Sequence, residues 1–263
     1  MRAVLNIISL FTILVLVGCA SDNATNPSEG EGEIRMHMVD SPTAAEEVVV
    51  VVNRVEVHSA GSDSTSGWVV VNDQPASYDL LKLRNGASAI LGSAKLKAGR
   101  YTQIRLILGA GSYVRVGGTN YDLQVASGFQ TGVKLVHTFE IEADKVYELY
   151  LDFDADRSVR QSGPNQYRLT PVIRVQASVT SGSISGSIVP ANAGAYIWTT
   201  VGRDTVSTYA AADGTFKLMA LPEGTYTVTI ESLSNAYLGM AVPNVVVARQ
   251  QTTTLGTITL SSR

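Results

Sequence analysis

Short runs of alternating apolar and polar residues, separated by glycine and proline, constrain this chain more than any other feature. In residues 195–201, for example, Ala, Ile, Thr and Val alternate with Tyr, Trp and Thr. A period of two places alternate side chains on opposite faces of a strand, whereas helices repeat every 3.6 residues. Similar runs recur from Glu33 to the C-terminus, so we predict an all-β protein.

We predict a first domain at residues 33–179. One stretch interrupts its strand pattern, because Ala87 to Lys95 is rich in Ala, Leu and Ile and favours a helical turn or two, although Gly92 weakens that signal. The expected strands are residues 33–39, 48–59, 68–72, 78–83, 101–108, 113–116, 119–125, 135–141, 146–153 and 167–179.

We predict a second domain at residues 180–263, where seven short runs at sandwich-like spacing indicate another β-sandwich. The two domains share a local phrase, Leu-Lys-Ala-Gly-Arg-Tyr-Thr at 96–102 and Leu-Pro-Glu-Gly-Thr-Tyr-Thr at 221–227. Each phrase has a glycine two residues before a tyrosine that opens a strand. We therefore expect similar corners in two tandem sandwiches.

The N-terminus has the pattern of a bacterial lipoprotein signal. Arg2 precedes an apolar stretch, Val4 to Val17, which leads into Leu-Val-Gly-Cys at 16–19. A transmembrane helix needs about 20 apolar residues, more than this stretch supplies before polar residues 21–23. We therefore predict a signal peptide at residues 1–18 and a lipid on Cys19, the one cysteine of the chain.

Residues 19–32 are predicted to form a flexible, lipidated tether, because they are polar and lack hydrophobic periodicity. Ala20 rather than Asp follows the cysteine, which under the enterobacterial sorting rule favours the outer membrane. Since lipidation uses the only thiol, stability must come from packing rather than from disulfides.

The charge balance argues against a nucleic-acid partner. The chain has 20 Lys and Arg against 23 Asp and Glu, a net charge of -3, so it offers no basic field to a phosphate backbone.

Several motifs of the first domain resemble a bacterial lipoprotein family built on domain of unknown function 4382. This resemblance covers most of residues 33–179 and implies no activity. The motifs are Val39-Asp40-Ser41-Pro42, Val55-Glu56-Val57-His58, Tyr78-Asp79-Leu80-Leu81-Lys82-Leu83, Ala98-Gly99-Arg100-Tyr101-Thr102-Gln103-Ile104-Arg105-Leu106, Leu151-Asp152-Phe153-Asp154-Ala155-Asp156 and Pro171-Val172-Ile173-Arg174-Val175.

The second domain resembles a carboxypeptidase regulatory-like domain, a transthyretin-type sandwich grouped with carbohydrate-binding-like folds. The motifs are Gly182-Ser183-Ile184-Ser185-Gly186, Ala212-Asp213-Gly214-Thr215-Phe216 and Leu221-Pro222-Glu223-Gly224-Thr225-Tyr226-Thr227-Val228. Such domains recur as non-catalytic appendages of peptidases and outer-membrane receptors. The resemblance implies a scaffold rather than an active site.

No catalytic motif is visible, so we predict that the protein is not an enzyme. The chain lacks a Gly-x-Ser-x-Gly elbow, and His37, His58 and His137 are not spaced as zinc ligands. Residues 109–111 lack the third glycine of a phosphate-binding loop.

One acidic cluster is a candidate metal site. In an extended strand Asp152, Asp154 and Asp156 share a face, where their oxygens could hold Ca²⁺. A calcium-binding loop needs glycine at its sixth position, and this chain has Arg157 there, so the sequence departs from that pattern. We favour a solvated strand face whose repulsion is eased by nearby arginines, and we predict no other cofactor.

Tyr196 and Trp198 are the candidate ligand-binding residues, because strand alternation projects both rings away from the core. Exposed rings can stack on a sugar or bind a partner. A neighbouring domain can also cover them, and ordinary core packing is a third interpretation.

These features together predict a non-enzymatic, envelope-anchored lipoprotein that acts as a binding module, with a glycan as the favoured small ligand. The alternative is a structural or assembly partner of an outer-membrane receptor or another envelope protein. The expected partners are therefore the membrane, through the N-terminal lipid, and a glycan or an envelope protein.

Overall fold

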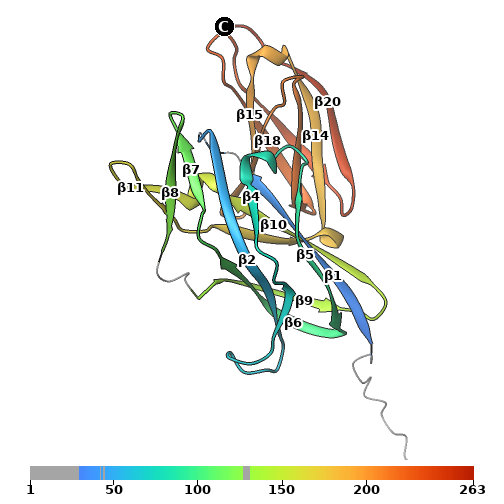
Figure 1. Ribbon diagram of the computed structural model, residues 1–263. Coiled ribbons are helices and arrows are strands. Elements are labelled where there is room, and N and C mark those ends of the chain that lie inside the picture. Colours follow the sequence, from blue (N-terminus) through green and yellow to red (C-terminus); the bar gives the residue numbers. More distant parts are fainter. Residues whose placement is uncertain (1–29, 42, 44, 127–130) are drawn as a thin grey trace, which may run out of the picture.

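The computed structural model describes residues 30–41, 43, 45–126 and 131–263 (Figure 1). Cys19, the predicted signal peptide and most of the predicted tether lie outside this range. The described chain is almost entirely β-strand, and the predicted tandem β-sandwich architecture is confirmed. Within the same residues no helix is long and apolar enough to span a bilayer.

The first unit, defined here by strands β1–β13, has two sheets that face each other (Figure 1). The smaller sheet has the order β13-β10-β1-β5. The larger has the order β11-β12-β8-β7-β2-β6-β9, with β3 and β4 also paired to β2. The strands are β1 (Glu31–Ser41), β2 (Glu47–Ser59), β3 (Trp68–Asn72), β4 (Ala76–Asp79), β5 (Ala89–Lys97), β6 (Gly99–Leu108), β7 (Tyr113–Val116), β8 (Thr119–Val125), β9 (Val133–Ile141), β10 (Val146–Asp154), β11 (Val159–Gly163), β12 (Gln166–Leu169) and β13 (Ile173–Ala177), and the short helix α1 is Ala155–Ser158.

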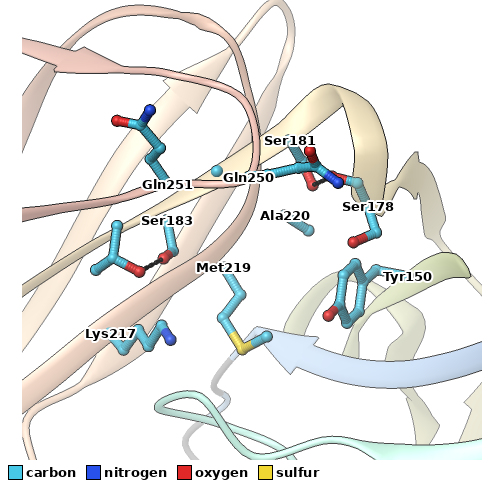
Figure 2. A pocket seen from close by; sticks show the side chains of 11 residues that line it. Tyr150, Ser178, Ser181, Ser183, Lys217, Met219, Ala220, Gln250 and Gln251 are labelled. Carbon is cyan, nitrogen blue, oxygen red and sulfur yellow. Dashed lines mark hydrogen bonds between the residues drawn. The ribbon is translucent and has the colours of Figure 1, made fainter.

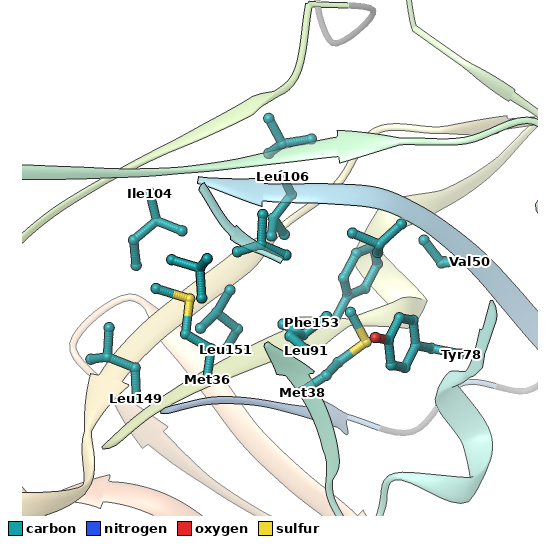
Figure 3. Close-up of a cluster of buried hydrophobic side chains, with 14 of the residues drawn as sticks. Met36, Met38, Val50, Tyr78, Leu91, Ile104, Leu106, Leu149, Leu151 and Phe153 are labelled. Carbon is teal, nitrogen blue, oxygen red and sulfur yellow. The ribbon is translucent and has the colours of Figure 1, made fainter. Parts of the chain in front are cut away.

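The core of the first unit lies between these two sheets (Figure 3). β1 and β10 run parallel, and their register sets Met36 beside Leu149 and Met38 beside Leu151. These four side chains are fully buried and face apolar residues of the larger sheet, among them Ile104. Removing each such side chain from water contributes about 1.5–3 kcal/mol, so this layer stabilises the first unit.

The predicted helical turn at residues 87–95 is wrong, because residues 89–95 lie in β5. β5 pairs antiparallel with β1 and buries Leu91 and Leu96. Gly92 lets β3 approach, since a Cβ there would lie 2.7 Å from the Asn72 Cβ. Long-range pairing with β1 therefore overrides the weak local helix propensity of the segment.

The second unit, defined by β14–β20, is a smaller sandwich of a β17-β14-β20 sheet and a β16-β15-β18-β19 sheet. Its core contains Ile184, Ile197, Phe216, Val228 and Ile230. The strands are β14 (Ser181–Val189), β15 (Ala195–Val201), β16 (Asp204–Tyr209), β17 (Thr215–Pro222), β18 (Gly224–Ser232), β19 (Met240–Val247) and β20 (Thr252–Thr259).

The repeated phrase forms the same corner in both units, as predicted. β6 begins at Gly99 and β18 at Gly224, each two residues before the tyrosine. The Tyr101 hydroxyl donates to the Lys97 carbonyl at 3.1 Å, and the Tyr226 hydroxyl donates to the Pro222 carbonyl at 2.7 Å. Each tyrosine thus ties the start of its strand to the carbonyl four residues earlier.

Each unit has a hydrophobic cluster of its own, one from Ile34 to Ala177 and the other from Ile184 to Leu260. Because a domain is defined by its own core, we expect residues 180–263 to fold when expressed alone. Dispersed amide shifts in an NMR spectrum would support the division at residues 179 and 180. Random-coil shifts for this fragment would contradict it.

Candidate ligand-binding groove between the two units

The outer face of the β17-β14-β20 sheet carries a ladder of hydroxyl groups. We call it the hydroxyl face and define it as Ser183, Ser185 and Ser187 of β14 with Thr252, Thr254 and Thr257 of β20. The paired hydroxyls lie 2.7 Å apart at Ser183 and Thr252 and 3.3 Å apart in the other two pairs. The face is therefore polar without being charged.

The local sequence explains this ladder. In β14 the serines alternate with Ile184, Gly186 and Ile188, and both isoleucines are buried in the core. Gly186 leaves room for the Phe216 ring, since a Cβ there would lie 2.8 Å from Phe216 Cε1. In β20 a register shift at Gly256, with φ of 70°, brings Thr257 opposite Ser187.

Two cavities lie over this face, and the first unit forms a wall of each. The Tyr150 cavity, of about 230 Å³, lies between Tyr150 and Ser178 on one side and Ser183, Gln251 and Met219 on the other (Figure 2). The second, the Asn85 cavity of about 440 Å³, lies between Asn85 and the Ser185–Ser187 part of the ladder. We call the two together the seam groove.

Lys217 of β17 lines both cavities. It is the only charged residue among the described residues that line them, and the rest of the polar lining consists of hydroxyl, amide and backbone groups. The Tyr150 ring adds an apolar face, and burial raises the pKa of its hydroxyl, so that hydroxyl remains a hydrogen-bond donor at neutral pH. The groove can therefore bind a polar ligand by hydrogen bonds and ring stacking.

Asn85 of the first unit holds β17 in place. Its carboxamide nitrogen donates to the Thr215 carbonyl at 3.2 Å, and its carboxamide oxygen accepts from the Lys217 N–H at 2.6 Å. Its own N–H donates to the Thr208 hydroxyl at 3.1 Å. The side chain thus bonds to the open edge of β17 as a neighbouring strand would.

Arg174 of β13 makes the second set of bonds across the seam. One guanidinium nitrogen donates to the Ala220 carbonyl of β17 at 2.7 Å, and another donates to the Asp152 carboxylate at 2.8 Å. The side chains of Arg174 and Asp152 are 15% and 8% exposed. Water screens this pair little, so within the first unit it holds the guanidinium in place for its bond to the Ala220 carbonyl.

The prediction that Asp152, Asp154 and Asp156 share one strand face is wrong. β10 ends at Asp154, whose carboxylate accepts from the Arg157 N–H and caps α1, so Asp156 lies in that helix. Asp152 is buried against Arg174, whereas Asp156 is exposed and accepts from the Thr43 hydroxyl. No set of three or more His, Cys, Asp or Glu in the described part of the chain could hold a metal ion.

Asp40 is a buried carboxyl group that the sequence did not single out. One oxygen accepts from the Ala155 N–H at 3.2 Å, and the other has no partner among the described residues. Burial, and then the charge of Asp152, raise the pKa of Asp40 well above its usual value. Burial also raises the pKa of Asp152, although Arg174 opposes this shift.

Tyr196 and Trp198 project from the same face of β15, so the predicted alternation is confirmed, and both side chains are half-buried. The Trp198 indole N–H donates to Glu231 at 3.0 Å. The Tyr196 ring lies 5.4 Å from that of Tyr209, over which Arg84 of the first unit sits at 5.5 Å. Tyr196 is thus close to the seam, but neither ring lines the seam groove.

Sequence reasoning missed the residues of the groove. The signal for the floor was present, because serines at 183, 185 and 187 and threonines at 252 and 254 follow a period of two. The wall of the groove that the first unit forms had no sequence signal, since Asn85 and Tyr150 come to lie opposite the second unit only when the two units dock.

The described chain is thus an all-β protein with two sandwiches and a polar groove between them. Residues 31–171 match the family described as Domain of unknown function (DUF4382), more than half of the 263 residues, and the chain belongs to that family. A search of the curated proteins finds no match.

The similar solved structures include a cohesin–dockerin complex and two pilins. A type II cohesin–X-dockerin complex from Acetivibrio cellulolyticus is 24% identical over 31% of this chain, with a TM-score of 0.25, and the match spans 58% of that chain. The shaft pilin SpaA of Lactobacillus rhamnosus GG is 10% identical over 90% of this chain and 98% of its own, with a TM-score of 0.27. BcpA, the major pilin subunit of Bacillus cereus, is 11% identical over 89% and 71%, with a TM-score of 0.26.

The raised pKa of Asp40 predicts how stability depends on pH. A carboxyl group whose pKa is higher in the folded state stabilises the fold below its unfolded pKa, and this contribution is lost as pH rises through the folded pKa. Asp40→Asn keeps an acceptor for the Ala155 N–H and removes the buried charge. We expect the variant to be more stable than the wild type by about 1–3 kcal/mol at pH 8, with a smaller difference at pH 4.

Urea denaturation at both pH values measures this effect. The exposed Asp63→Asn change is the control and should alter stability by less than about 0.5 kcal/mol. An Asp40→Asn variant that is less stable than the wild type by the same amount at both pH values would show that the assignment is wrong.

Proposed function

We propose that this protein is a non-enzymatic binding protein of the outer membrane, anchored by a lipid on Cys19, that holds a glycan in the seam groove. The observation that carries the proposal is the chemistry of the groove lining. Serine and threonine hydroxyls, the Gln251 amide and the Tyr150 ring match the hydroxyl groups and apolar faces of a sugar. The resemblance of the second unit to carbohydrate-binding-like sandwiches supports the same ligand class.

The affinity expected for such a groove is modest. Neutral hydrogen bonds contribute about 1 kcal/mol each, and one ring contact adds about 0.5–1.5 kcal/mol. A few of these interactions give a dissociation constant of about a millimolar once the cost of association is subtracted. Many lipid-anchored copies on one surface would raise the effective affinity without new contacts.

The absence of an enzymatic role is supported by the placement of the histidines. His37, His58 and His137 lie beside three different aromatic rings: Tyr150, Trp68 and Phe139. Among the described residues the histidines belong to no group of three or more His, Cys, Asp or Glu side chains that could hold a metal ion. Burial lowers the pKa of His137, which keeps this ring uncharged at neutral pH.

An assembly role is the second candidate, favoured by apolar side chains at the surface of the second unit. Leu233, Leu238, Met240 and Val246, in β19 and the loop before it, are 41–61% exposed. Among the described residues β19 pairs only with β18, so one edge of β19 is open. Exposed apolar residues beside an open edge suit a protein partner in the envelope.

The anchoring part of the proposal is tested by Cys19→Ala. This change removes the thiol to which the lipid would attach, so we expect no acyl incorporation and an uncleaved precursor. Metabolic labelling with a fatty-acid analogue, followed by membrane fractionation, measures both. Acyl labelling of the variant at the wild-type level would refute the lipoprotein assignment.

The binding part is tested by comparing Tyr150→Ala with Trp198→Ala. After a glycan array has identified a ligand, NMR titration should show about five- to tenfold weaker binding for Tyr150→Ala, because one ring contact is lost. Trp198→Ala should bind like the wild type. The reverse result would move the site to the β15 face, and an array without any ligand for the wild type would favour the assembly role.

A further inference from the structure

Lys217 has a position in the groove that the neutral lining does not explain. Its side chain is half-buried and lines both cavities (Figure 2). In that view its ammonium end points toward the Met219 thioether inside the Tyr150 cavity. No ion pair or side-chain hydrogen bond links this ammonium to another described residue. This half-buried ammonium therefore has no partner among the described residues, and an anion that enters the groove could pair with it.

We propose that the ligand of the seam groove is an acidic glycan whose carboxylate pairs with Lys217 while its hydroxyl groups bond to the hydroxyl face. The proposal rests on the proposed function and specifies the ligand class of the same site.

The surroundings of Lys217 leave its charge available. The side chain also borders a small cavity that contains Asp40 and Asp152. Asp152 is already paired with Arg174, and burial favours the neutral form of Asp40. No acidic residue is among the described residues lining the two cavities of the groove, so nothing there repels an incoming carboxylate.

Lys217 is also held in position before any ligand binds. Its backbone N–H donates to the Asn85 carboxamide at 2.6 Å. Its side chain packs against Gly86, where an added Cβ would lie 3.2 Å from Lys217 Cδ. The ammonium therefore loses little conformational freedom on binding, which increases the net strength of an ion pair.

The backbone pairing of the sheet favours a glycan over an acidic peptide. Extended peptides bind sheets by joining an open edge through backbone hydrogen bonds. The floor of the groove is β14, which is paired on both sides, with β17 and β20. The outer edge of β17 is bonded by Asn85 and Arg174. The floor of the groove thus offers hydroxyl groups, which a sugar matches, and β14 itself has no free edge to which a peptide strand could add.

The test compares a trimer of galacturonate with its methyl ester, which keeps the sugar hydroxyls and loses the charges. Calorimetric titration of the full mature chain should show the acid binding about tenfold more tightly than the ester, because bonds to charged groups are the stronger ones. Lys217→Gln should remove this preference, while Lys217→Arg should retain most of it. Lys97→Gln, an exposed lysine at the end of β5, is the matched control and should leave both affinities unchanged.

Three results would overturn the inference, and they are distinguishable. Equal binding of acid and ester by wild type and Lys217→Gln would refute the role of Lys217 and leave the glycan groove intact. If oligoglutamate competed at the same concentration as the galacturonate trimer, the ligand class of the groove would be an acidic peptide and not a glycan. Failure of the acid, the ester and every neutral glycan to bind would remove the proposed function together with this inference. Equal melting temperatures of the variants would exclude misfolding as the cause.

Discussion

The open edge of β17 is closed by side chains of the first unit, and the seam groove depends on that closure. An edge strand presents unpaired N–H and C=O groups, which proteins cover or pair. Asn85 supplies one donor and one acceptor to β17, and Arg174 supplies a further donor two residues before its end. These bonds are directional, so they fix both the distance and the rotation between the sandwiches. Tyr150 and Ser178 are thereby placed opposite the hydroxyl face.

The charged residues at this seam come from motifs that lie far apart in the sequence. Asp40 and Ser41 end β1, Asp152 lies near the end of β10, and Arg174 lies in β13. The Ser41 hydroxyl donates to Asp152, which also binds Arg174. Such a buried network contributes little net stability compared with apolar packing, but removing one partner leaves an uncompensated charge. Its contribution to the seam is to hold the Arg174 guanidinium in place for its bond to the Ala220 carbonyl of the second unit.

Much of the fold could be predicted from local pattern, and much of the site could not. The alternation in residues 195–201 and the corners at Tyr101 and Tyr226 depend only on neighbouring residues, so the sequence was sufficient to predict them. The helical turn expected at 87–95 failed because β1, more than 50 residues away, pairs with that segment. Asp156 does not lie on the predicted strand face, because Asp154 caps the short helix α1 and Asp156 lies in that helix. The Asn85 bonds to β17 join residues 130 or more positions apart, and no periodicity reports such a contact.

The division of the groove between two units has a thermodynamic consequence for binding. Tyr150 and Asn85 belong to the first unit, whereas Lys217 and the hydroxyl face belong to the second. A ligand that contacts both units binds best when they are docked. Its binding therefore stabilises the docked arrangement, and the gain in free energy equals the gain in affinity that docking gives the ligand. This coupling is reciprocal, since bonds that hold the seam closed also raise the affinity of the groove. Burial and the charge of Asp152 both oppose the ionisation of Asp40, which lines a small cavity between the units, so the stability of the folded chain depends on pH at this point.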